Sequence, residues 1–228
     1  MALEIFAVCI WGGLVALDTT AALQLMISQP LVACSVTGAL LGNFPMGFFM
    51  GILQQLIWLQ ELPVGTAKFS EGNIGAVSAA AIAILATEST LRPTTAVGMA
   101  LIISLAVSAF GGQLVIEMRQ INGRIYRRLL DNPEFSFSEV TRAHLTGVGL
   151  AFALGFATTL IFTPLFGLAV VPKLISFVPV SLDRIFEPLR SAFLGAGCGV
   201  MIYLFFFQRY WWLLFAGLAG GALIAIFY

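Results

Sequence analysis

The chain has 228 residues, of which 60% are hydrophobic and 10% are charged. Soluble domains are about 45–50% apolar and ~25% charged, and disordered chains combine low hydrophobicity with high net charge, so this composition excludes both classes. The eleven basic and eleven acidic side chains cancel, and no net field is left to attract nucleic acid. The sequence predicts an integral membrane protein in a lipid bilayer, without a nucleic-acid partner.

Uncharged windows locate the expected membrane segments, since a spanning helix needs ~20 mostly apolar residues. Residues 94–116, 191–208 and 210–228 each fit one span, and residues 143–172 fit a tilted helix with a short extra piece. The apolar run from Ile5 lacks the basic start of a signal peptide, so we expect it to remain in the membrane. The fold class predicted is an all-α polytopic helical bundle.

A longer uncharged window, residues 19–60, contains two prolines, Pro30 and Pro45. A proline inside a helix costs ~3 kcal/mol, so we expect short, broken helices here. Broken helices at membrane depth usually line a protected cavity or a substrate site. Residues 72–87 are also short for a span, which favours a partial or re-entrant helix.

The one hydrophilic stretch comprises residues 117–142. Its arginines are Arg119, Arg124, Arg127, Arg128 and Arg142. The positive-inside rule counts basic residues near the ends of spans, so this stretch is predicted to be a cytoplasmic loop; a docking face for a soluble partner is the alternative. It divides a single membrane domain, residues 1–228, into an N-terminal part (1–116) with the expected substrate site and C-terminal membrane helices (143–228).

Polar residues concentrate in residues 54–73, between two apolar segments. Carboxylates and amides can hydrogen-bond sugar hydroxyls, and tryptophan packs against the apolar face of a sugar ring. A connecting loop would explain most of these residues, but not why Gln54 and Gln55 lie within an apolar helix. The candidate binding residues are Gln55, Trp58, Glu61, Glu71 and Asn73.

Asp18 places a carboxylate between two long uncharged windows. Such a group costs ~2.5–3.5 kcal/mol at the bilayer centre, so it should face a cavity or have a partner. We include Asp18 and Gln24 as possible supporting groups of the substrate site. The alternative is that Asp18 caps a helix that starts at Thr19 or Thr20.

Motifs for covalent or metal chemistry are absent from the sequence. It has no Gly-x-x-x-x-Gly-Lys phosphate loop and no His-Glu-x-x-His zinc motif. Cys9, Cys34 and Cys198 are isolated in apolar segments and are expected to act as small hydrophobes. The single histidine, His144, stands where the hydrophilic stretch meets the membrane and is expected to be structural. We expect no catalytic residue, no metal site and no cofactor.

Several motifs follow one another between residue 18 and about residue 80. They are DTTAA at 18–22, Gln24, MISQPLVA at 26–33, Gly38, LG at 41–42, Gly47, Gly51, QLIWL at 55–59 and LPVG at 62–65. In this order they resemble the IIC component of mannose/fructose/sorbose-type phosphotransferase systems. Beyond residue 80, only the order of membrane segments and the overall size agree.

The resemblance implies a multi-pass permease of the bacterial cytoplasmic (inner) membrane that moves a hexose or amino sugar to be phosphorylated by the IIB subunit. It implies a membrane partner, IID, soluble IIA and IIB phosphocarriers, and a homo-oligomer of IIC–IID units. The fold that it implies is all-helical, with re-entrant helices and a mobile core that carries sugar by an elevator mechanism. Because the phosphorylated histidines of such systems lie on IIA and IIB, a chain without catalytic residues agrees with this role.

The resemblance implies that Gln55 is the polar residue that the family carries within this helix. It also implies that Ser70 and Glu71 occupy the place of the family's acidic loop pair, which is usually Pro-Asp. Lys68 adds a charge where the pattern is usually uncharged, and Gln29 stands where arginine is common. These departures leave the sugar open and keep a non-transporting regulatory or scaffolding partner of phosphotransferase proteins as an alternative. Composition alone would also allow an ion-coupled carrier of small solutes.

Overall fold

The computed structural model describes residues 1–22, 24–59, 70–131, 134, 136–206 and 212. The regular elements of these residues are all helical, so the predicted all-α class is confirmed. Five helical segments among them are long and apolar enough to cross a membrane, as expected of a polytopic membrane protein. The span predicted at residues 210–228 lies outside the described residues, apart from Trp212.

The first helix ends in a π-helical turn, which is wider than an α-helical one. Helix α1 (Ala2–Ala16) continues into a π-helical turn, η1 (Leu17–Ala21). It packs against helix α6 through two glycines: a methyl group on Gly155 would lie 2.2 Å from the carbonyl oxygen of Gly12. Small residues of this kind allow membrane helices to approach closely.

Two short helices follow, α2 (Pro30–Leu40) and α3 (Phe44–Trp58). At 1.5 Å per residue they are about 16 and 22 Å long, shorter than the ~30 Å hydrocarbon core. The prediction of short helices is confirmed, and both prolines stand in first turns, where they cost no helical hydrogen bond. Gly42, with φ of +73°, makes the turn between them. A methyl group on Gly38 would lie 2.8 Å from the Cα of Gly47.

Helix α4 (Gly72–Thr90) lies at the centre of the bundle and packs against α1, α2, α3, α5 and α6. Its 19 residues are long and apolar enough to cross a membrane, so the helix is longer than the window 72–87 in which a partial or re-entrant helix was predicted. The helix continues past Glu88 and ends where Leu91 adopts the left-handed conformation. Residues 74–86 are buried on all sides of the helix, and six of the fully buried residues are alanines: Ala76, Ala79, Ala80, Ala81, Ala83 and Ala86.

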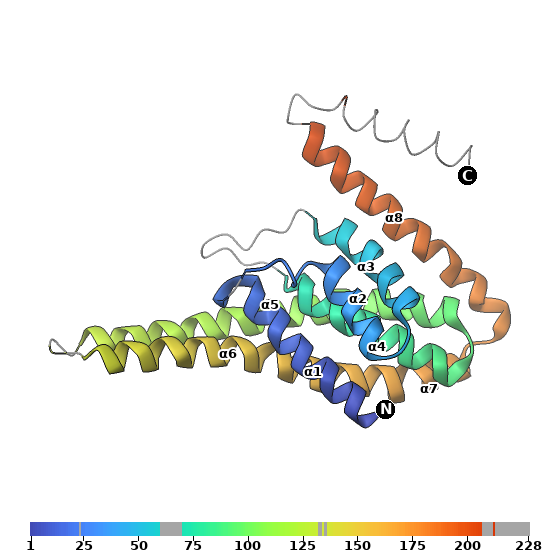
Figure 1. The fold of residues 1–228 in the computed structure, drawn as a ribbon. Coiled ribbons are helices and arrows are strands. Elements are labelled where there is room, and N and C mark those ends of the chain that lie inside the picture. Colours follow the sequence, from blue (N-terminus) through green and yellow to red (C-terminus); the bar gives the residue numbers. More distant parts are fainter. Residues whose placement is uncertain (23, 60–69, 132–133, 135, 207–211, 213–228) are drawn as a thin grey trace.

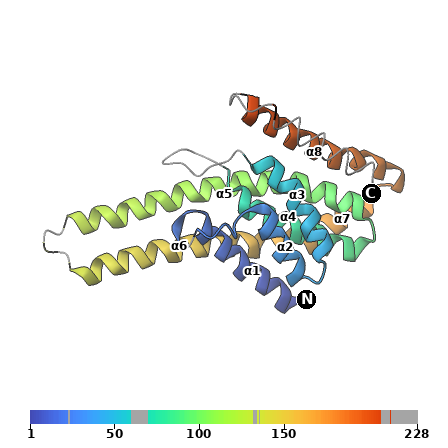
Figure 2. The same cartoon turned by 45° about the horizontal axis from the view of Figure 1, so that its top comes forward.

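Helices α5 (Pro93–Leu130) and α6 (Phe137–Pro164) are the longest in the structure. They lie side by side and project well beyond the other helices (Figures 1 and 2). We call the projecting part, residues 117–130 of α5 and 137–148 of α6, the arm. Residues 117–130 and 137–142 of the hydrophilic stretch, which was expected to be a loop, are helical. Its cytoplasmic location stays a prediction.

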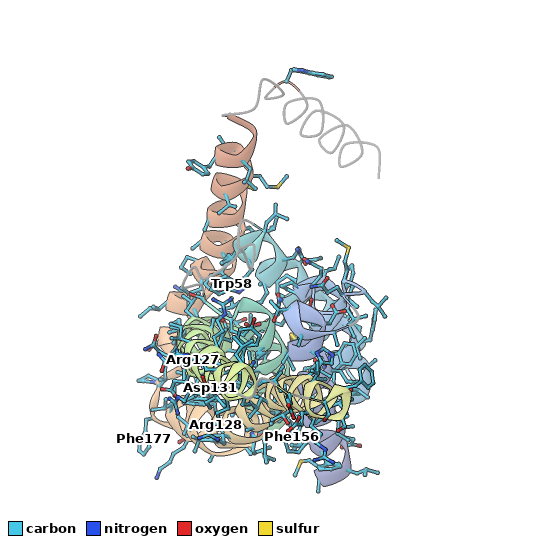
Figure 3. All side chains as sticks on the ribbon, turned by 90° about the vertical axis from the view of Figure 1, so that its left-hand side faces the viewer. Trp58, Arg127, Arg128, Asp131, Phe156 and Phe177 are labelled. Carbon is cyan, nitrogen blue, oxygen red and sulfur yellow. The ribbon has the colours of Figure 1, made fainter. Side chains whose placement is uncertain are left out.

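The tip of the arm carries polar and charged side chains. Seen along the arm, Arg127, Arg128 and Asp131 gather at its near end (Figure 3). Ser136 caps α6 in a capping box with Glu139. Hydrogen bonds from the backbone N–H and then the hydroxyl of Ser136 hold the pKa of Glu139 below its ordinary value, so the cap stays charged to a lower pH than it would without these bonds.

Helix α6 is followed by several short helical pieces. A π-helical turn, η2 (Leu165–Val170), leads into α7 (Val171–Phe177), a 3-10 turn, η3 (Val180–Leu182), and α8 (Asp183–Phe206). The long helix with a short extra piece predicted at residues 143–172 agrees with this arrangement. Helix α8 leaves the bundle at an angle (Figure 1) and contacts mainly α3 and α5.

Arg92 fixes the start of α8. Its guanidinium forms an ion pair with the carboxylate of Asp183 and donates to the carbonyl oxygens of Ile175 (2.7 Å) and Val178 (2.8 Å). Thr95 donates a further hydrogen bond to Asp183. The corner between α7 and α8 is therefore attached to the turn between α4 and α5.

Candidate functional site

Glu71 stands directly before α4 and is only 3% exposed. Its backbone N–H donates to the carbonyl oxygen of Ser108 on α5 (2.8 Å). Its carboxylate accepts a long hydrogen bond from the hydroxyl of Thr19 in η1 (3.5 Å), and the same hydroxyl oxygen accepts from the amide of Asn73 (3.2 Å). The structure therefore brings the predicted residues Glu71 and Asn73 together, at a helix N-terminus that favours negative charge.

A face of small residues on α5 makes room for this carboxylate. A methyl group on Gly111 would lie 2.9 Å from the Cβ of Glu71, and Ser108 lies against Gly75, one turn further along α4. With Ser104, these positions form one stripe on α5. Sequence reasoning missed the stripe, although three small residues at helical spacing in an apolar segment were the available signal.

Trp58 is held by Gln54, which is fully buried. The indole Nε1 donates to Gln54 Oε1 (2.8 Å), and Gln54 Nε2 donates to the hydroxyl of Ser104 (2.7 Å). The indole ring lies against Gly72, where an added Cβ would be 2.5 Å from Trp58 Cδ2. Trp58 lies at the end of α3, beyond the arm in Figure 3. The start of α4 therefore has the aromatic ring on one side and the Glu71 carboxylate beside it.

Gln55 has different partners from Gln54. Its Nε2 donates to Gln29 Oε1 (2.9 Å), and its Oε1 accepts from the backbone N–H of Leu31 (3.1 Å). It thereby joins the end of α3 to the first turn of α2. Gln55 and Gln29, the two glutamines that the resemblance singles out, are direct neighbours.

Asp18 is buried, with 3% of its surface exposed. Its carboxylate accepts hydrogen bonds from the backbone N–H groups of Leu25 (2.5 Å) and Ser28 (2.9 Å). Gln24, directly before Leu25, and Met26, directly after it, adopt positive φ angles of 52° and 64°, which is unfavourable for non-glycine residues. Asp18 therefore holds a strained loop, and the alternative that it caps a following helix is wrong. Gln24 is exposed in this loop.

Two predicted features lie outside the described residues. These are the candidate Glu61 and Lys68, the expected neighbour of Glu71. Among the residues that are described, no three histidine, cysteine or acidic side chains group as metal ligands. Cys34 is fully buried and donates to the carbonyl oxygen of Ala76 (3.2 Å), as expected of a cysteine that packs as a small side chain.

Chemically, the start of α4 presents a carboxylate, an amide, a hydroxyl and an indole ring. These groups can accept and donate hydrogen bonds to hydroxyls and cover an apolar ring face. Glu71 also borders a small cavity whose wall includes residues of η1, α5 and α6. The volume of this cavity, about 10 Å³, is room for about one water molecule.

The family comparison concerns the chain as a whole. The sequence model described as "PTS system sorbose-specific iic component" matches residues 2–226. The chain belongs to this family. The resemblance inferred from residues 18–80 is thus confirmed over almost the whole chain, and a multi-pass protein of the bacterial inner membrane is the consequence.

Individual relatives of this IIC-family chain are distant. It is 28% identical over 159 residues to the PTS system sorbose-specific EIIC component of Klebsiella pneumoniae. The match covers 68% of this chain and 56% of that protein, so it spans little more than half of the relative's length.

Two solved structures have the same fold. A chain described as "Structure of membrane protein" aligns with a TM-score of 0.72 at 18% identity, over 100% of this chain and 95% of the other. A chain of the cryo-EM structure of the mannose transporter ManYZ with microcin E492 aligns with a TM-score of 0.60 at 17% identity, again over 100% and 95%. At these identities the likeness concerns the fold.

Proposed function

We propose that this IIC-family chain is the sugar-translocating membrane subunit of a mannose/fructose/sorbose-type phosphotransferase system, with a hexose or amino sugar as its substrate. The observation that carries the proposal is the buried Glu71 carboxylate at the start of α4, with Asn73 and Thr19 on one side and the Trp58 ring nearby. Family membership supports the same function and does not favour a regulatory partner or an ion-coupled carrier.

In this proposal Glu71 accepts hydrogen bonds from sugar hydroxyls, and Asn73 both donates and accepts them. The contact between Thr19 and Glu71 is long, at 3.5 Å, and a sugar hydroxyl at ordinary hydrogen-bond distance would replace it favourably. Trp58 covers the apolar face of the ring, held in orientation by Gln54. Gln55, on α3, supports the site through its hydrogen bonds to Gln29 and Leu31 at the start of α2.

The proposal assigns phosphorylation to the soluble subunits. We infer a complex with IID in the membrane and with IIA and IIB in the cytoplasm, assembled as a homo-oligomer of IIC–IID units. The site lies among the short helices α2 and α3 and the start of α4, where broken helices can shift together. An elevator-like movement of this region would present the sugar to IIB.

The test is phosphoenolpyruvate-dependent uptake of labelled hexoses and amino sugars. Cells without other permeases would express the chain with its neighbouring IIA, IIB and IID genes. Glu71→Gln replaces the carboxylate with a neutral amide, so the hydrogen bonds from the sugar hydroxyls no longer have a charged acceptor. Because a hydrogen bond to a charged group is worth ~1.5–3 kcal/mol, the sugar concentration that gives half-maximal uptake should rise by roughly ten- to 150-fold.

Glu88→Gln is the matched control, since it makes the same change at the exposed far end of the same helix. It should leave uptake unchanged. Co-purification of IID with each variant would show that the membrane complex assembles. Equal uptake by the Glu71 and Glu88 variants would remove Glu71 from the site, and an assembled complex that takes up none of the sugars would contradict the proposed function.

A further inference from the structure

The outer face of the arm carries three exposed arginines, Arg124, Arg127 and Arg128. On a helix of 3.6 residues per turn they lie within an arc of about 100°. Ile125 and Leu129 face the other way, since both line the groove between α5 and α6. Arg127 and Arg128 are visible at the near end of the arm in Figure 3. We call the three residues the arginine face.

The helix that carries the arginine face does not neutralise it. Arg124 and Arg128 stand one turn apart, a spacing at which like charges destabilise a helix. Asp131 is the one carboxylate three or four residues from any of the three arginines. Within the part of the chain that the structure describes, none of the three makes an ion pair. The face therefore presents more positive than negative charge to its surroundings.

Exposed apolar side chains border the arginine face near the tip of the arm. Tyr126 and Leu130, one turn apart on α5, are 60% and 54% exposed, and Phe137 at the start of α6 is 87% exposed. Exposed apolar side chains that occur together mark sites of protein contact. Aromatic residues and arginine are also the types enriched at such contacts. The tip of the arm therefore has the composition of a protein-binding surface.

The arginine face extends beyond the lipid headgroups. The uncharged window of α5, residues 94–116, is about 34 Å long, close to the ~30 Å of the hydrocarbon core. Arg127 and Arg128 follow about 16–18 Å further along the helix axis, whereas the headgroup layer is only about 5–8 Å thick. The remaining distance of roughly 10 Å exceeds the ~8 Å Debye length. Anionic lipid therefore attracts these two arginines only weakly, and a soluble partner fits them better.

We propose that the arm is the docking surface for the soluble IIB subunit of the proposed phosphotransferase system, and that IIB binds it through an acidic surface. Carboxylates of IIB pair with the arginine face, and an apolar contact forms at Tyr126, Leu130 and Phe137. The inference rests on the proposed function, because IIB must reach the side of the membrane where the sugar leaves. The positive-inside rule predicts the arm on that side. A second copy of this chain is the poorer occupant, since it would bring the same positive charge.

The experiment measures the association and dissociation rates of purified IIB on the complete IIC–IID complex. The complex is held in nanodiscs of phosphatidylcholine and phosphatidylglycerol. Replacing both Arg127→Gln and Arg128→Gln should lower the association rate at low salt by about tenfold, because charges at an interface mainly steer the encounter. Near 1 M salt, where the Debye length is ~3 Å, the variant and the parent should associate at similar rates.

The matched control is the pair Lys173→Gln and Arg184→Gln. It removes two exposed positive charges from α7 and the start of α8, at the other end of the molecule from the tip of the arm (Figure 1). This variant should bind IIB as the parent does. Phe137→Ser should instead raise the dissociation rate about fivefold or more at every salt concentration, as expected for a central apolar contact.

Nanodiscs of pure phosphatidylcholine separate the docking surface from a lipid-binding one. The loss caused by Arg127→Gln with Arg128→Gln should be the same in them. A loss that disappears without phosphatidylglycerol would show that the arginines act on lipid and would overturn the proposal. So would equal losses from the arm pair and the control pair, no binding of IIB to the parent complex, or a smaller oligomer in the arm variants.

Sugar uptake separates this inference from the proposed function. The arm variants should need about tenfold more IIB for half-maximal uptake and should keep the maximal rate, since the arm is remote from Glu71. Normal uptake by the parent, together with IIB binding that ignores the arm substitutions, rejects only the docking surface. IIB binding that depends on the arm, without uptake of any sugar, contradicts only the proposed function.

Discussion

The hydrogen bond between Gln54 and Trp58 can be measured by a double-mutant cycle. Gln54→Leu removes the acceptor of the indole N–H (2.8 Å) and the donor to Ser104 (2.7 Å). Ser104 keeps its own bond to the carbonyl oxygen of Leu101 (2.7 Å), so the indole N–H is the donor left without a partner. We expect the free energy of unfolding to fall by about 1–2 kcal/mol, because an unsatisfied buried group costs ~1–3 kcal/mol and membrane-protein hydrogen bonds average ~0.6 kcal/mol.

In the Trp58→Phe background, the same Gln54→Leu change should cost about 1 kcal/mol less, since no N–H remains to be left unpaired. The assay is reversible unfolding in mixed micelles, followed by circular dichroism, for the parent, both single variants and the double variant. Gln55→Leu is the control: its partners are Gln29 and Leu31, so its cost should not depend on residue 58. If the cost of Gln54→Leu is the same in both backgrounds, within the ~0.3–0.5 kcal/mol scatter of additive pairs, then Gln54 does not hold the indole ring.

Two further changes test the backbone around the site. Asp18→Ala removes the acceptor for Leu25 and Ser28, so amide hydrogen exchange in this loop should quicken by at least tenfold; unchanged exchange would mean that the loop holds itself. Gly38→Ala should lower the free energy of unfolding by about 1–3 kcal/mol, since the new methyl group meets backbone atoms at 2.7 and 2.8 Å. Gly123→Ala, on an exposed stretch of α5 with no atom within 4 Å of the new methyl, should instead be neutral or slightly stabilising.

The sequence was sufficient for the fold class and for the broken helices. Both predictions rest on effects that act within a few residues, namely the solvation of apolar side chains by hydrocarbon and the missing N–H of proline. The extent of α4 was not predictable in the same way, because a charge at Glu88 ended the uncharged window while the helix itself continued for two more residues. Charge marks the edge of the hydrocarbon region, whereas helix ends depend on backbone conformation.

The hydrophilic stretch 117–142 was misjudged for a related reason. Charged residues predict exposure to water, and exposure is compatible with a helix as well as with a loop. The arginines of this stretch are good helix formers, and the two helices support each other as an antiparallel pair. Helix propensity was therefore the better guide to its structure, and the positive-inside rule addresses only its side of the membrane.

The candidate site was predictable in residue type but not in pairing. Sequence pattern singled out Glu71 and Asn73 as candidates, yet both contact Thr19, which lies 52 residues before Glu71. Likewise, Gln54 and Gln55 are adjacent in sequence but bond to α5 and to the start of α2, respectively. Such long-range pairs depend on how helices pack, which one sequence does not specify.

The positions of these polar groups have a common physical cause. A helix interior satisfies its own backbone groups, so a buried polar side chain there needs another side chain, as Gln54 needs Trp58 and Ser104. Where a helix is broken, backbone groups also need partners. Asp18 accepts from the backbone N–H of Ser28 after η1, and Gln55 accepts from that of Leu31 in the first turn of α2. The backbone N–H of Glu71, before α4, donates to α5. Breaking the helices therefore concentrates polar groups at one place in an apolar protein. The proposed sugar site needs such a place, and short helices rather than additional charge provide it in this chain.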